Sequence, residues 1–159
     1  MLEVLPSLLT EFSDISYLIG GDGNDRARLE EKVRALDLSD RVVFAGYIAE
    51  EEKSDHYRLC DGFILASRGE GFGIVLLEAL ASGVPVLGSK IDGTREALLD
   101  GDLGVLVDPD NQDALRAGIR EVLAHAPGRI PEKLSFYSYD AFEGRVHDIV
   151  ADLQEKNAS

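Results

Sequence analysis

Short apolar runs alternate with helix-period segments along most of this chain of 159 residues. The runs at 15–19, 41–45 and 62–66 are apolar on both faces, which is typical of strands buried on both sides of a sheet. Further strands are expected at 84–87 and 103–107. Helices are expected at 2–12, after Asn24 or Asp25, and at 51–60, 74–82, 94–99, 111–125 and about 139–154. This alternation predicts an α/β fold, a Rossmann-like parallel sheet with helices on both faces.

Length and charge exclude several classes of protein. The length fits one domain, and we expect residues 1–159 to form a single core. Apolar residues make up 45% of the chain and charged residues 29%, which excludes a disordered tail. Thirty acidic against 16 basic side chains give a net charge of −14, so the chain repels nucleic-acid backbones. No nucleic-acid partner is expected.

The expected location is cytoplasmic. The lone Cys60 cannot form an internal disulfide, and the first residues lack the basic region of a secretory signal. The nearly uncharged stretch 71–89 is long enough to suggest a membrane span, but Glu78 lies in its middle and Pro85 near its end. We therefore expect no transmembrane segment.

Ligands of an open parallel sheet bind beyond the carboxyl ends of its strands, so the loops there are the candidate sites. The loop at Gly21 and Gly23 begins like a dinucleotide fingerprint, but Arg26 stands where the third glycine belongs. A tight turn explains these glycines better than a nicotinamide site, so a nicotinamide-dependent oxidoreductase ranks last among the functions considered.

The segment 67–81 is the most informative, because a glycine-rich loop runs straight into an apolar helix. Gly71 and Gly73 allow a ligand to approach the backbone, and the free N–H groups of the first helical turn favour an anion such as phosphate. Glu78 lies on an otherwise apolar helix and needs partners such as sugar hydroxyls. In an alternative that the sequence leaves open, Glu78 pairs with an arginine and Glu70 is only a loop residue.

The spacing of the two acids argues against a glycosidase. Eight helical residues span about 12 Å, which is too far for the carboxylate pair of such an enzyme. Glu70 and Glu78 are therefore expected to hold opposite ends of one extended ligand.

These segments resemble the retaining, nucleotide-sugar-dependent glycosyltransferases of family 4, which have two Rossmann-like domains in the GT-B arrangement. The chain is similar to their C-terminal half. The resemblance is carried by residues 19–23 (IGGDG), 40–47 (DRVVFAGY), 70–78 (EGFGIVLLE), 83–86 (GVPV), 92–96 (DGTRE) and 104–107 (GVLV).

The resemblance implies a role for each matching residue. Glu70 would be the catalytic residue that faces the donor sugar, and the amides around Gly71, Phe72 and Gly73 would hold the sugar hydroxyls. Glu78 would accept hydrogen bonds from both ribose hydroxyls of the nucleotide. The amides of Ile74 and Val75 would meet the diphosphate, and the loop of Gly46, Tyr47 and Ile48 would contact the base.

The implied reaction transfers a hexose, with retention, from a nucleoside-diphosphate sugar to a glycan, lipid or small-molecule acceptor, as in polysaccharide biosynthesis. It commonly proceeds without a metal, so no metal and no cofactor are expected. The full-length enzyme would be cytoplasmic or peripheral to the membrane. The alternative is a non-catalytic module of the same fold that binds a nucleotide or a partner.

The resemblance also implies that parts of the enzyme are missing. Family members begin this domain with a strand and loop whose arginine and lysine neutralise the diphosphate, whereas the first basic residue here is Arg26. The N-terminal acceptor domain and the first strand would be absent, and the chain alone would be inactive and bind its donor weakly. Loss of strand 1 from the order 3-2-1-4-5-6 leaves two unpaired edges. We expect the strand at 15–19 to pair directly with that at 62–66, or a homo-oligomer to form through these edges.

Other residues receive structural interpretations. His56 and Cys60 are four apart, as in some metal sites, but no second ligand pair accompanies them. Arg68 is more often a solvated loop residue than a phosphate ligand. Tyr137, Tyr139 and Phe142 are expected to be packing residues.

Overall fold

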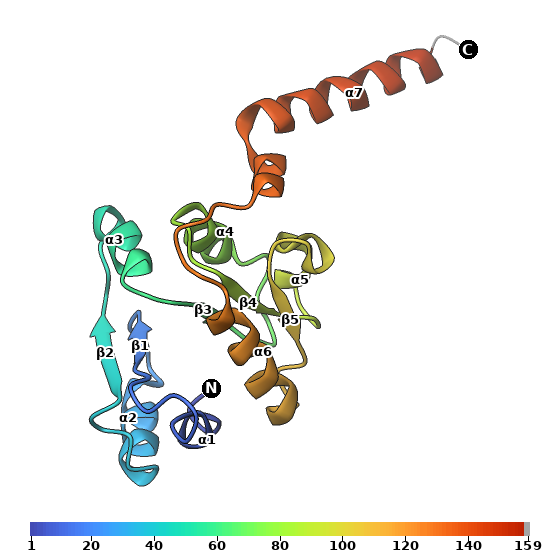
Figure 1. Cartoon of the computed structure of the whole chain (residues 1–159). Helices are drawn as coiled ribbons and strands as arrows, with labels where there is room; N and C mark the ends of the chain where they lie inside the picture. The colour runs from blue at the N-terminus through green and yellow to red at the C-terminus, as the bar shows by residue number, and fades with distance from the viewer. Residues whose placement is uncertain (158–159) are drawn as a thin grey trace.

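The structure, a computed structural model, describes residues 1–157, so the last two residues of the expected domain 1–159 lie outside it. Its strands are β1 (Tyr17–Gly20), β2 (Val42–Gly46), β3 (Phe63–Leu65), β4 (Val86–Ser89) and β5 (Val105–Val107). Its α-helices are α1 (Leu5–Leu8), α2 (Arg26–Ala35), α3 (Lys53–Arg58), α4 (Ile74–Ala81), α5 (Thr94–Ala97), α6 (Gln112–Ala124) and α7 (Tyr139–Asn157). Short 3₁₀ helices are η1 (Glu50–Glu52), η2 (Leu99–Gly101) and η3 (Glu132–Tyr137). Strands and helices alternate as the sequence predicts (Figure 1).

The strands form two parallel sheets instead of one. β1 pairs with β2, with Tyr17 opposite Val42, and the second sheet has the order β3-β4-β5, with Phe63 opposite Val86. The expected direct pairing of the strand at 15–19 with that at 62–66 is therefore wrong for the residues described. β1 and β3 remain the inner strands of two half-sheets (Figure 1).

Helices cover both faces of the larger sheet, β3-β4-β5, and the combination of parallel strands and helices confirms the predicted α/β class. On one face, α6 packs through Leu115, Ile119 and Val122 against Leu87 of β4 and Val107 of β5. On the other face, α4 packs against β4 through a cluster that includes Leu76, Ala79, Leu80 and Val86. The periodic apolar positions of α4 and α6 thus form the core of the larger half-sheet.

The helix α1 joins the two half-sheets. Val4, just before α1, and Leu8, its last residue, belong to the core under α6. Leu2 and Leu5 belong to the core that α2 and β2 form. α1 is shorter than the predicted helix 2–12. The hydroxyls of Ser7 and Thr10 donate to main-chain carbonyls three residues earlier, which competes with regular helix formation.

Other boundaries move by a few residues. The strand predicted at 84–87 begins at Val86, because Pro85 has no N–H to donate to a neighbouring strand. The helix predicted at 51–60 is divided into η1 and α3 and ends at Arg58.

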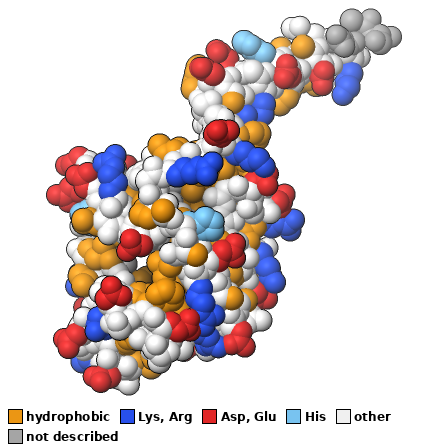
Figure 2. All heavy atoms as spheres, in the orientation of Figure 1, with side chains coloured by type: hydrophobic (Ala, Val, Ile, Leu, Met, Phe, Trp, Pro, Cys, Tyr) orange, Lys and Arg blue, Asp and Glu red, His pale blue; other side chains and the backbone are white. Residues whose placement is uncertain are grey.

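The helix α7 extends away from the body of the molecule (Figures 1 and 2). Tyr139 is 74% exposed and Phe142 57% exposed, so the expectation that they are packing residues is wrong for the described structure. Tyr137, the last residue of η3, does pack, against the core under α4. Among the described residues, no helix has both the length and the apolarity to cross a bilayer.

Candidate functional site

The loop between β3 and α4, residues 66–73, lies at the carboxyl end of β3, where the sequence places the site. It packs against the loop that follows β4. A Cβ atom at Gly93 would overlap the carbonyl oxygen of Gly71, so only glycine allows this approach. The Gly93 N–H also donates to the Glu70 carbonyl oxygen at 3.0 Å. The two loops therefore form one rigid backbone surface.

Asp92 holds this surface together. Its Oδ2 accepts hydrogen bonds from the Ser67 hydroxyl and from the Glu70 N–H, the latter at 3.2 Å. Its Oδ1 accepts one from the Thr94 N–H at 3.1 Å. Partial burial acts to raise the pKa of the Asp92 carboxyl, but the hydrogen bonds from Ser67 and Thr94 outweigh it and lower that pKa. The carboxylate is thus ionised and fixes the shape of the loop.

Asp92 belongs to the motif at 92–96, but no role was predicted for it. The available signal was an aspartate two residues before the first residue of a helix, a position that favours side-chain bonds to the helix start. Its bonds to Ser67 and Glu70 cross 25 and 22 residues of sequence.

The first turn of α4 presents free main-chain donors. Gly73 precedes the helix with φ of +88° in the left-handed region, and no side chain caps it. The N–H groups of Ile74 and Val75 have no acceptor within the helix, because the first N–H groups of any helix lack one. Ile74 is 64% exposed. This end of α4 therefore offers exposed N–H groups and the positive end of a helix dipole to an anion.

Glu70 lies in the loop before this helix. Its N–H is bound to Asp92, and its Oε1 accepts a long hydrogen bond from the Phe72 N–H at 3.4 Å. The Phe72 ring packs edge-on against Tyr137 with 5.9 Å between centroids. Glu70, Gly71, Phe72 and Gly73 thus occupy one loop, as predicted. Because α4 begins only at Ile74, the distance estimate that treated residues 70–78 as one helix does not apply.

Glu78 has partners from α3 that were not predicted from the sequence. Tyr57 Oη donates to Glu78 Oε2 at 2.8 Å, and Lys53 Nζ lies 3.7 Å from Glu78 Oε1. Burial and then the hydrogen bond to Glu78 raise the pKa of the Tyr57 phenol. The open alternative of an arginine partner is therefore replaced by a lysine and a tyrosine. The Glu78 side chain is still 30% exposed.

The loop predicted to contact the base, Gly46 to Ile48, follows β2. Gly46 has φ of +71° and its carbonyl oxygen accepts a hydrogen bond from the Gly21 N–H at 2.7 Å. A Cβ atom at Gly20 would lie 2.7 Å from Cδ1 of Ile48, so this glycine makes room for Ile48. Tyr47 is 82% exposed.

The two parts of the predicted site lie on different half-sheets (Figure 1). Within residues 1–157, no hydrogen bond or ion pair joins the loop 46–48 to the loop 66–73. The structure therefore brings residues 70–75 together, and Glu78 lies on α4, the helix that begins at Ile74. Gly46, Tyr47 and Ile48 lie apart from them, on the smaller half-sheet.

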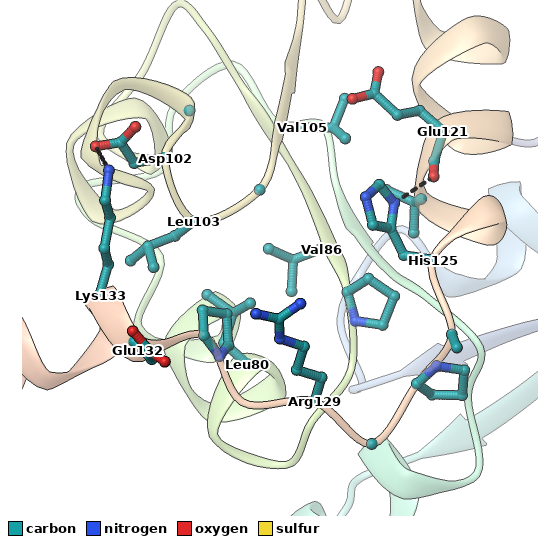
Figure 3. Close-up of a pocket in the computed structure, with 18 residues that line it drawn as sticks. Leu80, Val86, Asp102, Leu103, Val105, Glu121, His125, Arg129, Glu132 and Lys133 are labelled. Carbon is teal, nitrogen blue, oxygen red and sulfur yellow. Dashed lines mark hydrogen bonds and ion pairs between the residues drawn. The ribbon is translucent and has the colours of Figure 1, made fainter.

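A hollow of about 800 Å³ lies elsewhere (Figure 3). It borders Val86 and Val105, the first residues of β4 and β5, and an ion pair of 2.7 Å between Lys133 and Asp102. These are the amino ends of the strands, where Rossmann-like sheets do not bind their ligands. A second hollow, of about 660 Å³, borders Glu78 and Tyr137.

The other polar candidates have local partners. His56 Nδ1 lies 2.9 Å from the Glu52 carbonyl oxygen, and the Cys60 thiol donates to the His56 carbonyl oxygen at 3.3 Å. Arg68 forms an ion pair with Asp110. In the part of the chain that the structure describes, no group of three or more potential metal-ligating side chains lies together.

The parallel strands, the helices on both faces and the glycine loop at the carboxyl end of β3 define a Rossmann-like domain. A family model described as Glycosyl transferases group 1 matches residues 1–140. The chain belongs to this family.

Curated relatives of the chain include named glycosyltransferases. The chain is 36% identical over 124 residues to the phosphatidyl-myo-inositol mannosyltransferase of Mycolicibacterium smegmatis, a match that covers 77% of this chain and 31% of that protein. It is 31% identical over 156 residues to the alpha-monoglucosyldiacylglycerol synthase of Streptococcus pneumoniae, which covers 96% of this chain and 35% of that protein. The chain thus spans about a third of the length of these curated relatives.

Solved structures agree in fold. Sucrose-phosphate synthase from Thermosynechococcus elongatus superposes with a TM-score of 0.73 at 25% identity, covering 98% of this chain and 42% of that one. The Anabaena protein HepE in complex with UDP-glucose gives a TM-score of 0.60 at 28% identity, covering 67% of this chain and 30% of that one.

Proposed function

We propose that this chain is the donor-binding domain of a retaining glycosyltransferase of family 4, which transfers a hexose from a nucleoside-diphosphate sugar to a glycan, lipid or small-molecule acceptor. One observation carries the proposal. The exposed, uncapped start of α4 follows a loop that Asp92 holds rigid, in a chain of the group 1 family. A related structure of this family's fold was solved with UDP-glucose bound.

The diphosphate of the donor would bind at the amide groups of Ile74 and Val75. A helix start stabilises an anion by about 1 kcal/mol. Gly73, just before it, has φ of +88°, a left-handed conformation that glycine adopts without strain. The net charge of −14 opposes the binding of a dianion. Tight binding therefore requires cations from outside this helix start.

The sugar of the donor would lie over the loop that precedes α4. Glu70 would be the catalytic residue there, because it carries the only carboxylate of residues 66–73 and its main chain is fixed by Asp92. The amides around Gly71, Phe72 and Gly73 would bind the sugar hydroxyls. The reaction would retain the configuration of the sugar, with the leaving diphosphate helping to deprotonate the acceptor, and would need no metal.

The ribose would bind to Glu78. A carboxylate has about four lone-pair positions, and the Tyr57 hydroxyl occupies one of them at 2.8 Å. Lys53, at 3.7 Å, is beyond normal hydrogen-bonding distance. Two ribose hydroxyls can therefore bind while Tyr57 keeps the carboxylate in place. The base would then contact Gly46, Tyr47 and Ile48, provided that the smaller half-sheet approaches α4.

The whole enzyme would contain an N-terminal acceptor domain and the cations that neutralise the diphosphate, both outside this chain. The chain spans about a third of the length of its relatives, which leaves room for them. We expect the full protein to be cytoplasmic or peripheral to the membrane, and the isolated chain to be inactive. A homo-oligomer remains a prediction for the isolated chain.

Titration of the isolated chain with UDP-glucose and with GDP-mannose, followed by NMR, tests the proposal. We expect dissociation constants of about 1 mM or weaker, equivalent to about 4 kcal/mol of binding free energy. Glu78→Ala should weaken this binding about ten-fold, because it removes two charge-assisted hydrogen bonds to ribose. Glu96→Ala, in the exposed first turn of α5, is the matched control and should leave binding unchanged. Equal affinities of the wild-type chain and Glu78→Ala would disprove the ribose role.

A further inference from the structure

Phe72 lies between two glycines in the loop that precedes α4. A Cβ atom at Gly71 would meet open space, and Gly73 has φ of +88°. Glycine loses more conformational freedom on folding than any other residue, so ordering the main chain at this point is costly. Within residues 1–157, the Phe72 N–H has a single acceptor, Glu70 Oε1, at the long distance of 3.4 Å. The main chain therefore does little to fix residue 72.

Glu70, two residues earlier, is held differently. Its N–H donates to Asp92 Oδ2 at 3.2 Å, and its carbonyl oxygen accepts a hydrogen bond from the Gly93 N–H at 3.0 Å. Both main-chain groups of residue 70 are thus bound to the loop after β4. Neither of these hydrogen bonds involves Phe72, so the orientation of the Phe72 amide depends on what holds the Phe72 side chain.

Tyr137 supports that side chain. Its ring packs edge-on against the Phe72 ring, with 5.9 Å between centroids and 79° between the ring planes. Edge-on packing is one of the arrangements that aromatic pairs prefer. Phe72 is half-buried, and Tyr137 is its only aromatic neighbour in the described part of the chain. The contact with Tyr137 is therefore the main support of the Phe72 ring.

Tyr137 is itself fixed on several sides. Its hydroxyl donates to the Glu96 carbonyl oxygen in α5 at 3.0 Å. Its ring packs against the core under α4 and edge-on against Phe136, with 5.1 Å between centroids. The Arg145 guanidinium of α7 lies 4.2 Å from the centroid of the Phe136 ring and donates to the Phe136 carbonyl oxygen at 2.9 Å. Burial raises the pKa of the Tyr137 phenol, so the phenol stays protonated and can donate at neutral pH.

We propose that Tyr137 is a positioning residue of the donor site, which fixes the Phe72 amide at the place where the sugar of the donor would bind. The inference rests on the proposed function, in which the amides around Phe72 bind the sugar hydroxyls. Tyr137 acts through the Phe72 side chain and does not touch the donor. An amide that is already ordered binds a hydroxyl without the cost of being ordered first. Loss of this support should therefore weaken the binding of the sugar and not that of the nucleotide.

Order parameters of the main-chain amides, measured by NMR relaxation on the ligand-free chain, test the first step. We expect a value of about 0.85 for Phe72 in the wild-type chain, as in rigid main chain. Tyr137→Leu removes the ring and should lower this value below about 0.6, whereas Tyr137→Phe keeps the ring and should leave it unchanged. The Glu70 amide, which Asp92 holds, is the internal control and should stay rigid in every variant. A Phe72 amide that stays rigid in Tyr137→Leu would overturn the proposal.

Titration with UDP-glucose and with UDP, followed by NMR, tests the second step. Tyr137→Leu should weaken the binding of UDP-glucose by about five-fold and change the binding of UDP by less than about two-fold. Tyr137→Phe should bind both ligands like the wild-type chain. Tyr139→Leu is the matched control, because Tyr139 is 74% exposed, and should also bind both ligands unchanged. Equal weakening of both ligands by Tyr137→Leu would indicate a general structural role and would overturn the proposal.

Phe72→Ala tests the same contact from the other side. Phe72 does not belong to the core under α4, so this variant can be measured even if Tyr137→Leu fails to fold. It should weaken UDP-glucose binding as much as Tyr137→Leu, and the double variant should bind no more weakly than either single variant, because both changes remove one contact. Additive losses would overturn the proposal. Binding of neither ligand by the wild-type chain would contradict the proposed function instead, and the order parameters would still decide whether Tyr137 holds Phe72.

Discussion

Replacing Asp92 by asparagine should destabilise the loop that precedes α4. The carboxylate accepts hydrogen bonds from the Ser67 hydroxyl, the Glu70 N–H at 3.2 Å and the Thr94 N–H at 3.1 Å. Asparagine keeps one side-chain oxygen and has an NH₂ group in place of the other. If the NH₂ group replaces Oδ2, the Glu70 N–H faces a donor and loses its acceptor. A lost hydrogen bond to a charged group costs about 1.5–3 kcal/mol. We expect Asp92→Asn to lower the free energy of unfolding by about 2–3 kcal/mol at pH 7.

The assay is urea and thermal unfolding followed by circular dichroism. For a chain of this size, the expected loss corresponds to a fall in Tm of about 4–10 °C. Ser67→Ala, which removes one donor, should cost only about 1 kcal/mol. Asp110→Asn is the surface control, since its ion pair with Arg68 is exposed, and should change stability by less than about 0.5 kcal/mol.

The pH dependence gives an independent check. The pKa of Asp92 is lower in the folded chain than the ordinary value of 3.8. Its ionised form therefore contributes stability above that value, and the contribution is lost as the pH falls through the lower folded-state pKa. The difference between Asp92→Asn and the wild-type chain should shrink over that acidic range. An unchanged stability at pH 7, or a difference that persists undiminished in acid, would refute the role given to Asp92.

The remaining predictions concern the helix start, Glu78 and α7. Gly73→Ala should destabilise the chain by about 1–2 kcal/mol, measured by chemical denaturation, because residue 73 has φ of +88° and a Cβ atom there would lie 3.0 Å from Thr94 Cγ2. Gly71→Ala is the control and should leave stability unchanged, because a Cβ atom at residue 71 would meet open space. Tyr57→Phe should cost about 1 kcal/mol. The pKa of Tyr57 is raised above 10, so an ultraviolet titration of the wild-type chain should show a phenol that stays protonated beyond that value. The stability linked to this phenol should be lost as the pH rises above 10. An ordinary titration of every tyrosine would contradict this. Removing residues 147–159 should shift Tm by no more than about 2 °C, since Ile149 and Leu153 are exposed; a larger fall would show that the end of α7 packs on the body.

The fold class could be predicted because it depends on local patterns. The runs that became β1, β2 and β3 are apolar on both faces, and Gly83 and Gly46 mark the ends of elements by their left-handed φ. The loop before α4 was likewise predictable, because its glycines and the following apolar helix are consecutive in sequence.

The rest depends on contacts between distant residues. Tyr57 meets Glu78 across 21 residues, and Ser67 meets Asp92 across 25, which no periodicity indicates. The apolar stripe of α7 is typical of a packed helix, yet Phe142 and Ile149 are exposed, because a pattern shows that a face is apolar but not what covers it. The two unpaired strand edges could be predicted from the strand order. The two separate sheets, and the packing of α1 against both of them, could not.

The most direct test of the donor site is the crystal structure of the chain grown in an excess of UDP-glucose. The account predicts that the diphosphate lies within hydrogen-bonding distance of the Ile74 and Val75 amides, with Glu78 on the ribose. A diphosphate bound in the hollow beside Val86 and Val105 (Figure 3), with the start of α4 unoccupied, would contradict it.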